Sequence, residues 1–485
     1  MHAHETDKAL EAVQAAQPPS QQLAEPGCGC CRSRIVNLIL LSVVLIALIL
    51  AIVLSINSSV NATIKNTAPT TTVQFSPDGR LLVSETHEST ITHAVSFSCI
   101  GCRPASYDTR YTIKVWNAAS DTLLYSFPAY ANTGPGNRIG FSPDGRLLAT
   151  SSTRLAGNPN LWRITLRESQ HGTLLRTLAI DRPYASDFAF SPDGRLLAVE
   201  ADTFNDPNAN VDDSFSMIQI YDVSSGSLLH TLKGWSEGIS FLFSPDSSIL
   251  AVGSDPYNLL NQTGYAAIKL YDVASGRLLK SIAPPDSVWA DIYKFSTDGH
   301  TLLAFAGSPD GNDYEDIDYV DLASGRTTMS IERKFGHGLS ATALNPAQTL
   351  FAFSDWSDKS GVASEFYGTG SNTVSLWDAA TGKQIRVLEK QSGNYLTSTI
   401  KALVFSPDGR LLAGLGADNV IRIWDVATGT LLHTLGGYLS TVRTLAFSPD
   451  SRWLVTGSGY TTFLFWTPYT IRFWNVQSGM STKEL

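Results

Sequence analysis

The chain has 485 residues, of which 43% are hydrophobic, 10% are aromatic and only 16% are charged. This composition is typical of a globular protein that buries a large core. The 44 acidic residues outnumber the 35 basic ones, giving a net charge of −9, which argues against nucleic acid as a partner.

The N-terminal part of the chain is divided into three segments. Residues 1–34 are rich in Ala, Gln and Pro and are predicted to be a disordered tail. The stretch from Ile35 to Ile56 contains no charged residue, and at about 1.5 Å per residue it can cross a hydrocarbon core of about 30 Å. It predicts a single transmembrane helix, since the run is longer than the usual core helix or the apolar part of a signal peptide; cleavage after a small residue near Ser55–Ala62 is the alternative. Residues 57–69 form a linker.

Basic residues around the apolar stretch predict its orientation in the membrane. Arg32 and Arg34 precede it, whereas Lys65 is the nearest basic residue after it. Cytoplasmic flanks carry the excess of Lys and Arg. We therefore expect a single-pass protein of the cell membrane, with the N-terminus in the cytoplasm and the large C-terminal part outside.

Residues 402–435, with the sequence ALVFSPDGRLLAGLGADNVIRIWDVATGTLLHTL, indicate four short strands separated by turns. The expected strands are Leu403–Phe405, Leu411–Leu415, Val420–Trp424 and Thr430–Leu435. SPDG is typical of a type I turn, and Asp425 to Gly429 provides another turn before the last strand. Together the four strands predict one small antiparallel sheet.

This pattern occurs eight times from Thr70 to Leu485. The first strand of each copy ends in an apolar residue, at Phe75, Phe141, Phe190, Phe243, Phe295, Leu344, Phe405 and Phe447. The third strand ends in Trp-Asp or a related pair in six copies, whereas Arg167-Glu168 and Val320-Asp321 depart from it.

These repeats resemble the WD-repeat family of β-propellers. The resemblance implies an all-β fold of four-stranded antiparallel blades, with eight blades favoured over seven, in a domain spanning 70–485. Val60–Asn66 is an alternative closing strand for the last blade. The Gly-His pair typical of the family is absent from every copy, and Asp418 alone stands at the expected loop position. We therefore expect apolar packing, rather than the polar network of the family, to hold the blades together.

The first repeat contains a cluster of potential metal ligands, His87, His93, Cys99 and Cys102. These residue types suit zinc, but their spacing does not match the usual zinc modules. The alternatives are a disulfide between the two cysteines or free thiols. The acidic segment 308–318 suggests calcium, although its order differs from an EF-hand loop and a solvated turn is favoured. No catalytic motif was found, and neither an enzymatic activity nor a cofactor is predicted.

The links between second and third strands are long in seven of the eight repeats and short only around Asp418. The long links are predicted at 85–111, 152–160, 201–216, 255–266, 307–316, 355–372 and 458–468. Because strands alternate in direction, all these links leave the same face of the ring, where loops commonly carry recognition. Aromatic residues in or near them are candidates for binding a partner. They are Trp356, Phe366, Tyr367, Tyr257, Tyr314 and Trp466.

The sequence therefore predicts a membrane-tethered, non-catalytic scaffold that binds a protein or peptide. The alternatives are a propeller enzyme and a sensor of a small ligand or sugar, each with its site in the central channel. A further alternative is that the long links vary in length without binding anything.

Overall fold

The computed structural model describes residues 70–91, 107–129, 139–155, 158–180, 187–201, 216–235, 240–253, 268–282, 290–307, 315–331, 339–358, 369–394, 399–438, 441–459 and 470–484. The predicted tail, transmembrane segment and linker fall outside these ranges. Within the ranges, no helix has the length and apolarity needed to span a bilayer. The chain divides into two units, Met1–Lys65 and Asn66–Leu485, and the second contains all the described residues.

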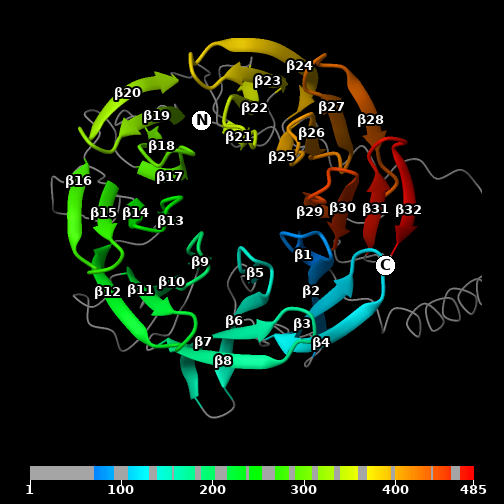
Figure 1. Cartoon of the computed structure of the whole chain (residues 1–485). Coiled ribbons are helices and arrows are strands. Elements are labelled where there is room, and N and C mark those ends of the chain that lie inside the picture. The colour runs from blue at the N-terminus through cyan, green and yellow to red at the C-terminus, as the bar shows by residue number, and fades with distance from the viewer. Residues whose placement is uncertain are drawn as a thin grey trace, which may run out of the picture. The chain divides into compact units, whose positions relative to one another are not determined.

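The described strands form eight four-stranded antiparallel sheets, which are the blades of a ring (Figure 1). Blade 1 consists of β1 (Thr70–Phe75), β2 (Leu81–Ile91), β3 (Tyr107–Asn117) and β4 (Leu123–Ala129). Blade 2 consists of β5 (Ile139–Phe141), β6 (Leu147–Leu155), β7 (Asn158–Glu168) and β8 (Leu174–Ile180). Blade 3 consists of β9 (Phe188–Phe190), β10 (Leu196–Ala201), β11 (Ser216–Asp222) and β12 (Leu228–Trp235). Blade 4 consists of β13 (Ser240–Phe243), β14 (Ile249–Gly253), β15 (Ile268–Asp272) and β16 (Leu278–Ile282).

The second half of the ring follows the same plan. Blade 5 consists of β17 (Ala290–Phe295), β18 (Thr301–Gly307), β19 (Glu315–Asp321) and β20 (Arg326–Ile331). Blade 6 consists of β21 (Leu339–Leu344), β22 (Leu350–Asp358), β23 (Thr369–Asp378) and β24 (Gln384–Asn394). Blade 7 consists of β25 (Ile400–Phe405), β26 (Leu411–Gly416), β27 (Ile421–Asp425) and β28 (Leu431–Leu435). Blade 8 consists of β29 (Val442–Phe447), β30 (Trp453–Ser458), β31 (Ile471–Asn475) and β32 (Met480–Glu484). The predicted eight blades are confirmed, and the alternative of seven is wrong.

The SPDG sequence builds the turn between the first and second strands through its own side chains. In blade 7, Ser406 Oγ donates a hydrogen bond to Asp408 Oδ1 over 2.5 Å and accepts one from the Leu411 N–H over 3.0 Å. The Gly409 N–H donates to the Ser406 carbonyl over 2.8 Å. The turn between the third and fourth strands is built similarly, because Asp425 Oδ1 accepts bonds from the N–H and hydroxyl of Thr428. Both turns thus follow from local sequence.

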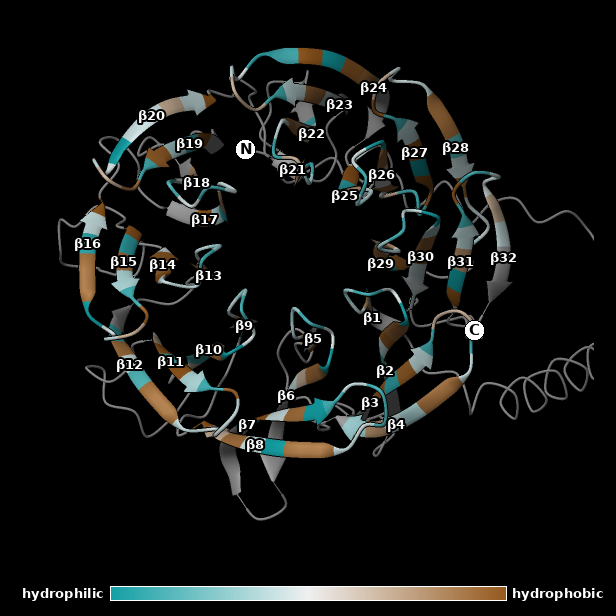
Figure 2. Ribbon diagram, viewed as in Figure 1, coloured by the Kyte–Doolittle hydropathy of each residue, from teal (hydrophilic) through white to brown (hydrophobic). Residues whose placement is uncertain are grey.

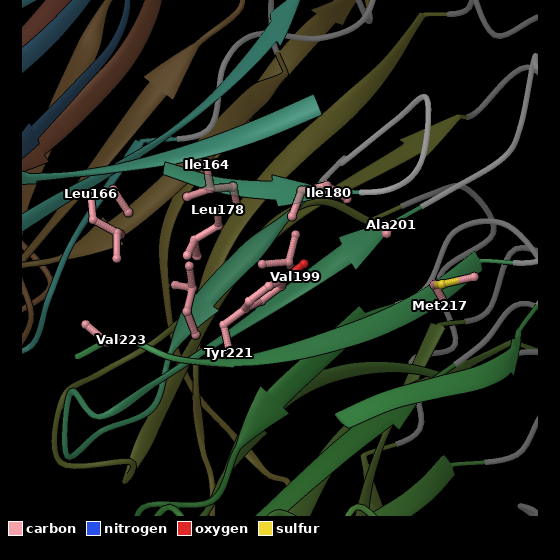
Figure 3. Packing of buried hydrophobic residues seen from close by; sticks show 11 residues of the cluster. Ile164, Leu166, Leu178, Ile180, Val199, Ala201, Met217, Tyr221 and Val223 are labelled. Atoms are coloured by element: carbon pink, nitrogen blue, oxygen red, sulfur yellow. The ribbon is translucent and has the colours of Figure 1, made fainter. Parts of the chain in front are cut away.

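The hydrophobic core lies between neighbouring blades rather than at the centre of the ring. Figure 3 shows one cluster, in which Ile164 and Leu178 of blade 2 belong with Val199 and Tyr221 of blade 3. Large side chains such as Trp424 and Phe351 are fully buried in equivalent clusters. Each blade therefore buries its two faces against its neighbours, which a single sheet cannot do alone.

The ring closes by packing between blade 8 and blade 1. Val73 and Leu82 form one cluster with Val455 and Phe473, although the two blades come from opposite ends of the domain. All four strands of blade 8 come from the C-terminal repeat, and β32 corresponds to the last strand that the sequence predicts at Met480–Leu485. The alternative closing segment Val60–Asn66 falls outside the described residues.

Polar contacts also stabilise several blades, so the expectation of packing without a polar network is wrong in blade 8. There the Tyr438 hydroxyl lies 2.7 Å from Thr456 Oγ1 and accepts a hydrogen bond of 2.7 Å from Trp474 Nε1. Trp116 Nε1 of blade 1 similarly donates to Ser84 Oγ over 3.0 Å. These tryptophans find serine, threonine or tyrosine acceptors, so no histidine is required.

The structure also explains why the second repeat has Arg167 where most repeats have an aromatic residue at the end of the third strand. Its guanidinium lies 4.3 Å from the centre of the Phe127 ring in blade 1 and donates to the Gly172 carbonyl over 2.9 Å. A cation over an aromatic face replaces the expected aromatic contact between the blades.

Candidate binding surfaces of the ring

The alternating strands give the ring two different sides. Turns between first and second strands, and between third and fourth strands, lie on one side, which we call the turn side. Links between second and third strands, and links between blades, leave the other side, which we call the link side. The first strands surround the channel and the fourth strands form the rim (Figure 1).

On the turn side, SPDG-type turns of neighbouring blades contact one another around the channel. At five junctions a glycine lies against the proline of the preceding turn; a Cβ placed on Gly79, for example, would lie 3.2 Å from Cδ of Pro449. The five pairs are Gly79 with Pro449, Gly145 with Pro77, Gly194 with Pro143, Gly299 with Pro245 and Gly409 with Pro346.

The other three junctions replace glycine by a residue that bonds to the preceding turn. Ser247, Gln348 and Ser451 have φ values of 64°, 56° and 61°. Their side chains accept hydrogen bonds of 3.1–3.2 Å from the N–H groups of Asp193, Thr297 and Asp408, respectively. All eight junctions are thus joined, and we call this set of contacts the inner ring.

A second set of contacts, the outer ring, joins fourth strands to the following blade, and hydrogen bonds make the contact at three junctions. Tyr125 donates to the Ser169 carbonyl over 2.5 Å, and Lys280 Nζ donates to the Ala323 carbonyl over 2.6 Å. His230 Nε2 lies 3.0 Å from the Ala274 carbonyl oxygen. The carbonyls belong to turns between third and fourth strands. The turn side is therefore a rigid surface with contacts both near the channel and near the rim.

Grooves open on the turn side between these two rings. One between blades 2 and 3 has a volume of about 510 Å³, and one between blades 3 and 4 has a volume of about 300 Å³. A smaller groove of about 180 Å³ lies between blades 8 and 1. The first is lined by Leu147, Leu166, Leu175, Arg176, Gly194, Arg195, Asp222, Val223 and Ser224.

The charge of Asp222, which borders the first two grooves, is set by its turn. Hydrogen bonds from Ser224 Oγ and from the N–H and hydroxyl of Ser225 lower the pKa of Asp222 to about 2. Its carboxylate is therefore ionised at neutral pH and already bonded within the turn.

Exposed apolar residues mark the start of most fourth strands, visible as brown segments of β8, β12 and β16 in Figure 2. Leu175 is 52% exposed and Leu229 is 45% exposed, and both border grooves. The sequence analysis did not identify this surface. In the sequence this surface corresponds to the Leu-Leu pair that recurs after the last turn of most repeats. Such a pair is equally typical of a buried strand, and its exposure follows only from the position of the fourth strand at the rim.

Two of the residues predicted for partner or metal binding lie within the described part of the chain. His87 and Trp356 lie on β2 and β22. Outside the described residues lie His93, Cys99, Cys102, Tyr257, Tyr314, Phe366, Tyr367 and Trp466. The acidic segment 308–318 is described only from Glu315. No group of three or more metal-ligating residues occurs within the described ranges.

Three predicted links are shorter than expected because their strands continue to pair. In blade 1 the ladder extends to Ile91 opposite Tyr107, within the predicted link 85–111. Leu155 pairs with Asn158 in blade 2, and Asp358 pairs with Gly370 in blade 6. These segments alternate polar and apolar residues too weakly to be recognised as strands.

Fold and repeat together define an eight-bladed β-propeller that carries WD40 repeats. The family described as "WD domain, G-beta repeat" matches residues 226–257, 382–425 and 429–467. These segments cover parts of blades 3, 4, 6, 7 and 8.

Individual known proteins are similar over their repeats. Protein tipD of Dictyostelium discoideum is 31% identical over 118 residues, which is 24% of this chain and 17% of tipD. Nuclear distribution protein PAC1 of Coccidioides posadasii is 37% identical over 169 residues, or 33% of this chain and 32% of PAC1. The chain thus spans less than two thirds of either relative. A crystal structure of the eukaryotic initiation factor shares the fold, with a TM-score of 0.52, 18% identity and coverage of 86% of this chain and 88% of that chain.

Proposed function

We propose that this chain is a membrane-anchored scaffold that binds a protein or peptide partner through the link side of its propeller, without catalysing a reaction. The observation that carries the proposal is the asymmetry of the ring. Eight blades joined by inner-ring and outer-ring contacts form a rigid frame, and every long link leaves the same side of it. Loops held by such a frame are well suited to recognition.

The anchor is the apolar segment from Ile35 to Ile56. With Arg32 and Arg34 on its N-terminal flank, the propeller is outside the cell. Protease added to intact cells is expected to digest or release the propeller. Protection until the membrane is permeabilised would show the opposite orientation.

Trp356, Phe366 and Tyr367 are proposed as the centre of the partner site, with Tyr257, Tyr314 and Trp466 contributing from other links. Large aromatic side chains dominate many protein interfaces. The propeller from Asn66 onward, immobilised and exposed to an extract, identifies partners by mass spectrometry. Replacement of Trp356, Phe366 and Tyr367 by alanine is then expected to abolish capture while Tm stays nearly constant.

The matched control for this experiment lies on the turn side. Leu228→Ala/Leu229→Ala removes two exposed apolar side chains from the rim of blade 3. Capture of the same partner should survive this change. If the control loses capture and the triple alanine variant retains it, the link side is not the site.

A further inference from the structure

The groove between blades 2 and 3 contains an outer-ring side chain that is not bonded to the following turn. Tyr125 and Lys280, at equivalent positions, each donate a hydrogen bond across their junction. Among the described residues, the guanidinium of Arg176 makes neither a hydrogen bond nor an ion pair. Only its stem approaches the turn, with Cδ 3.3 Å from where a Cβ on Gly226 would lie. Arg176 therefore retains its bonding capacity for a ligand.

The floor of this groove is apolar and already in place. Leu166 and Val223 belong to the buried cluster between the two blades (Figure 3). Leu175 stands at the rim with 52% of its surface exposed. An apolar side chain that entered the groove would cover Leu175 and contact the other two residues without moving a strand. Because burial contributes about 25 cal/mol per Å², this floor provides an anchor for an apolar side chain.

The walls of the groove are positively charged. Arg176 comes from blade 2 and Arg195 from blade 3, and both are exposed. Like Arg176, Arg195 has no hydrogen bond or ion pair from its guanidinium in the described part of the chain. The acidic residue in the lining is Asp222, whose carboxylate accepts three bonds from its own turn. The lining therefore carries two guanidinium ions against one carboxylate, a net positive charge that favours a carboxylate ligand.

The neighbouring groove has the opposite charge. Between blades 3 and 4 the lining contains Asp193, Asp222 and Asp272, with Arg195 as its basic residue. An acidic ligand would be repelled there and attracted to the groove between blades 2 and 3. The two grooves share Arg195 and Asp222, so they are adjacent. The difference in their charge predicts which of the two an acidic ligand occupies.

From these observations we infer that the groove between blades 2 and 3 is a second binding site, which takes an extended acidic segment of a partner protein. An apolar side chain of that segment occupies the floor, and an adjacent carboxylate pairs with Arg176 and Arg195. This site lies on the turn side and is separate from the link-side site proposed above.

The test uses random linear peptides displayed on phage, selected against the full chain purified in mild detergent. The expected consensus is an acidic residue next to a large apolar one. A selected peptide should bind Arg176→Glu/Arg195→Glu about tenfold or more weakly, since a hydrogen bond to a charged group contributes about 1.5–3 kcal/mol. Replacing the peptide's acidic residue by lysine should restore binding to this variant.

The matched control is Arg386→Glu/Arg410→Glu, which makes the same charge change at the equivalent positions between blades 6 and 7. There Arg386 lies directly over Gly429. Hydrogen bonds from Thr428 lower the pKa of Asp425, and the charge of Arg386 lowers it further. Binding should be unchanged in the control. Leu175→Ser, at an exposed position, gives a second variant that should weaken binding through loss of the apolar contact.

Failure to enrich any peptide, a consensus without an acidic residue, or equal loss of binding in both double variants would overturn the inference. These outcomes are distinct from failure of the proposed function. That function is tested by the loss of partner capture on replacing Trp356, Phe366 and Tyr367, none of which is changed in the variants used here.

Discussion

The two sides of the ring are under different structural constraints. On the turn side the same turns recur around the ring, and each contacts the turn of the preceding blade. On the link side, residues 417–420 suffice to join β26 to β27, whereas 202–215 join β10 to β11. A turn that must fit its neighbour at every junction cannot vary alone. A link that only joins two strand ends can change in length, which makes the link side suited to acquiring a partner.

The largest effect on stability is expected in the outer ring, at Gly172, where the neighbouring blade leaves no space for a side chain. Gly172 has a φ of +74°, and a Cβ there would lie 2.5 Å from the Tyr125 ring. Gly172→Ala should therefore lower the free energy of unfolding by about 2–3 kcal/mol, of which about 1–2 kcal/mol comes from the left-handed backbone. Urea unfolding measures the change. In Gly436→Ala the new Cβ has no atom within 4 Å, so an equal loss there would refute the packing argument.

A smaller effect is expected at the inner ring, where Ser451 combines a φ of 61° with a bond from the Asp408 N–H. Ser451→Ala keeps the backbone conformation and removes the acceptor, so it should cost about 1 kcal/mol. Ser451→Gly removes the same bond but relieves about 1 kcal/mol of backbone strain, leaving stability nearly unchanged. A midpoint for Ser451→Ala equal to that of the wild type would show that the bond does not join the blades, and equal midpoints for the two variants would show that the backbone at this position is not strained.

The turns also predict a dependence of stability on pH. Hydrogen bonds from Ser224 and Ser225 lower the pKa of Asp222 from 3.8 to about 2. Because the pKa is lower in the folded protein, the ionised turn stabilises it above the unfolded value, and this contribution is lost as the pH falls from about 4 to about 2. Asp222→Asn should be less stable than the wild type at neutral pH and match it near pH 2. A constant difference across this range, measured by chemical denaturation, would exclude ionisation as the cause.

The smallest effect is expected on the link side. Replacing 202–215 by the short turn 417–420 should change Tm little, since β10 and β11 already pair from Leu196 to Ala201. Each halving of a loop reduces the entropy cost of closing it by about 0.6 kcal/mol, so a slight increase in stability is expected. A large fall in Tm, measured by calorimetry, would show that this link is part of the frame.

Much of the propeller scaffold was predictable from sequence because its turns depend on contacts between residues close together in the chain. Ser406 and Asp408 bond within their own turn, and Asp425 bonds to Thr428 three residues later. Eight repetitions of such signals predicted the strand order and the number of blades. Strand ends were less predictable, because extended pairing such as Ile91 with Tyr107 depends on the partner strand. The polar contacts of Trp474 were missed because Tyr438 occupies the position where a histidine was expected.

The sequence by itself determined the repeat, its turns, the blade count and the side from which the long links leave, because all of these depend on contacts within a blade or on strand direction. Tertiary structure alone decided how blades meet. It placed Arg176 beside Arg195, far apart in the sequence, above a floor shared by two blades. It also gave Ser247, Gln348 and Ser451 their acceptor roles, since each depends on a turn that belongs to the preceding repeat. A groove between two sheets leaves no recognisable pattern in the sequence of either sheet, because it forms only when the two sheets pack against each other.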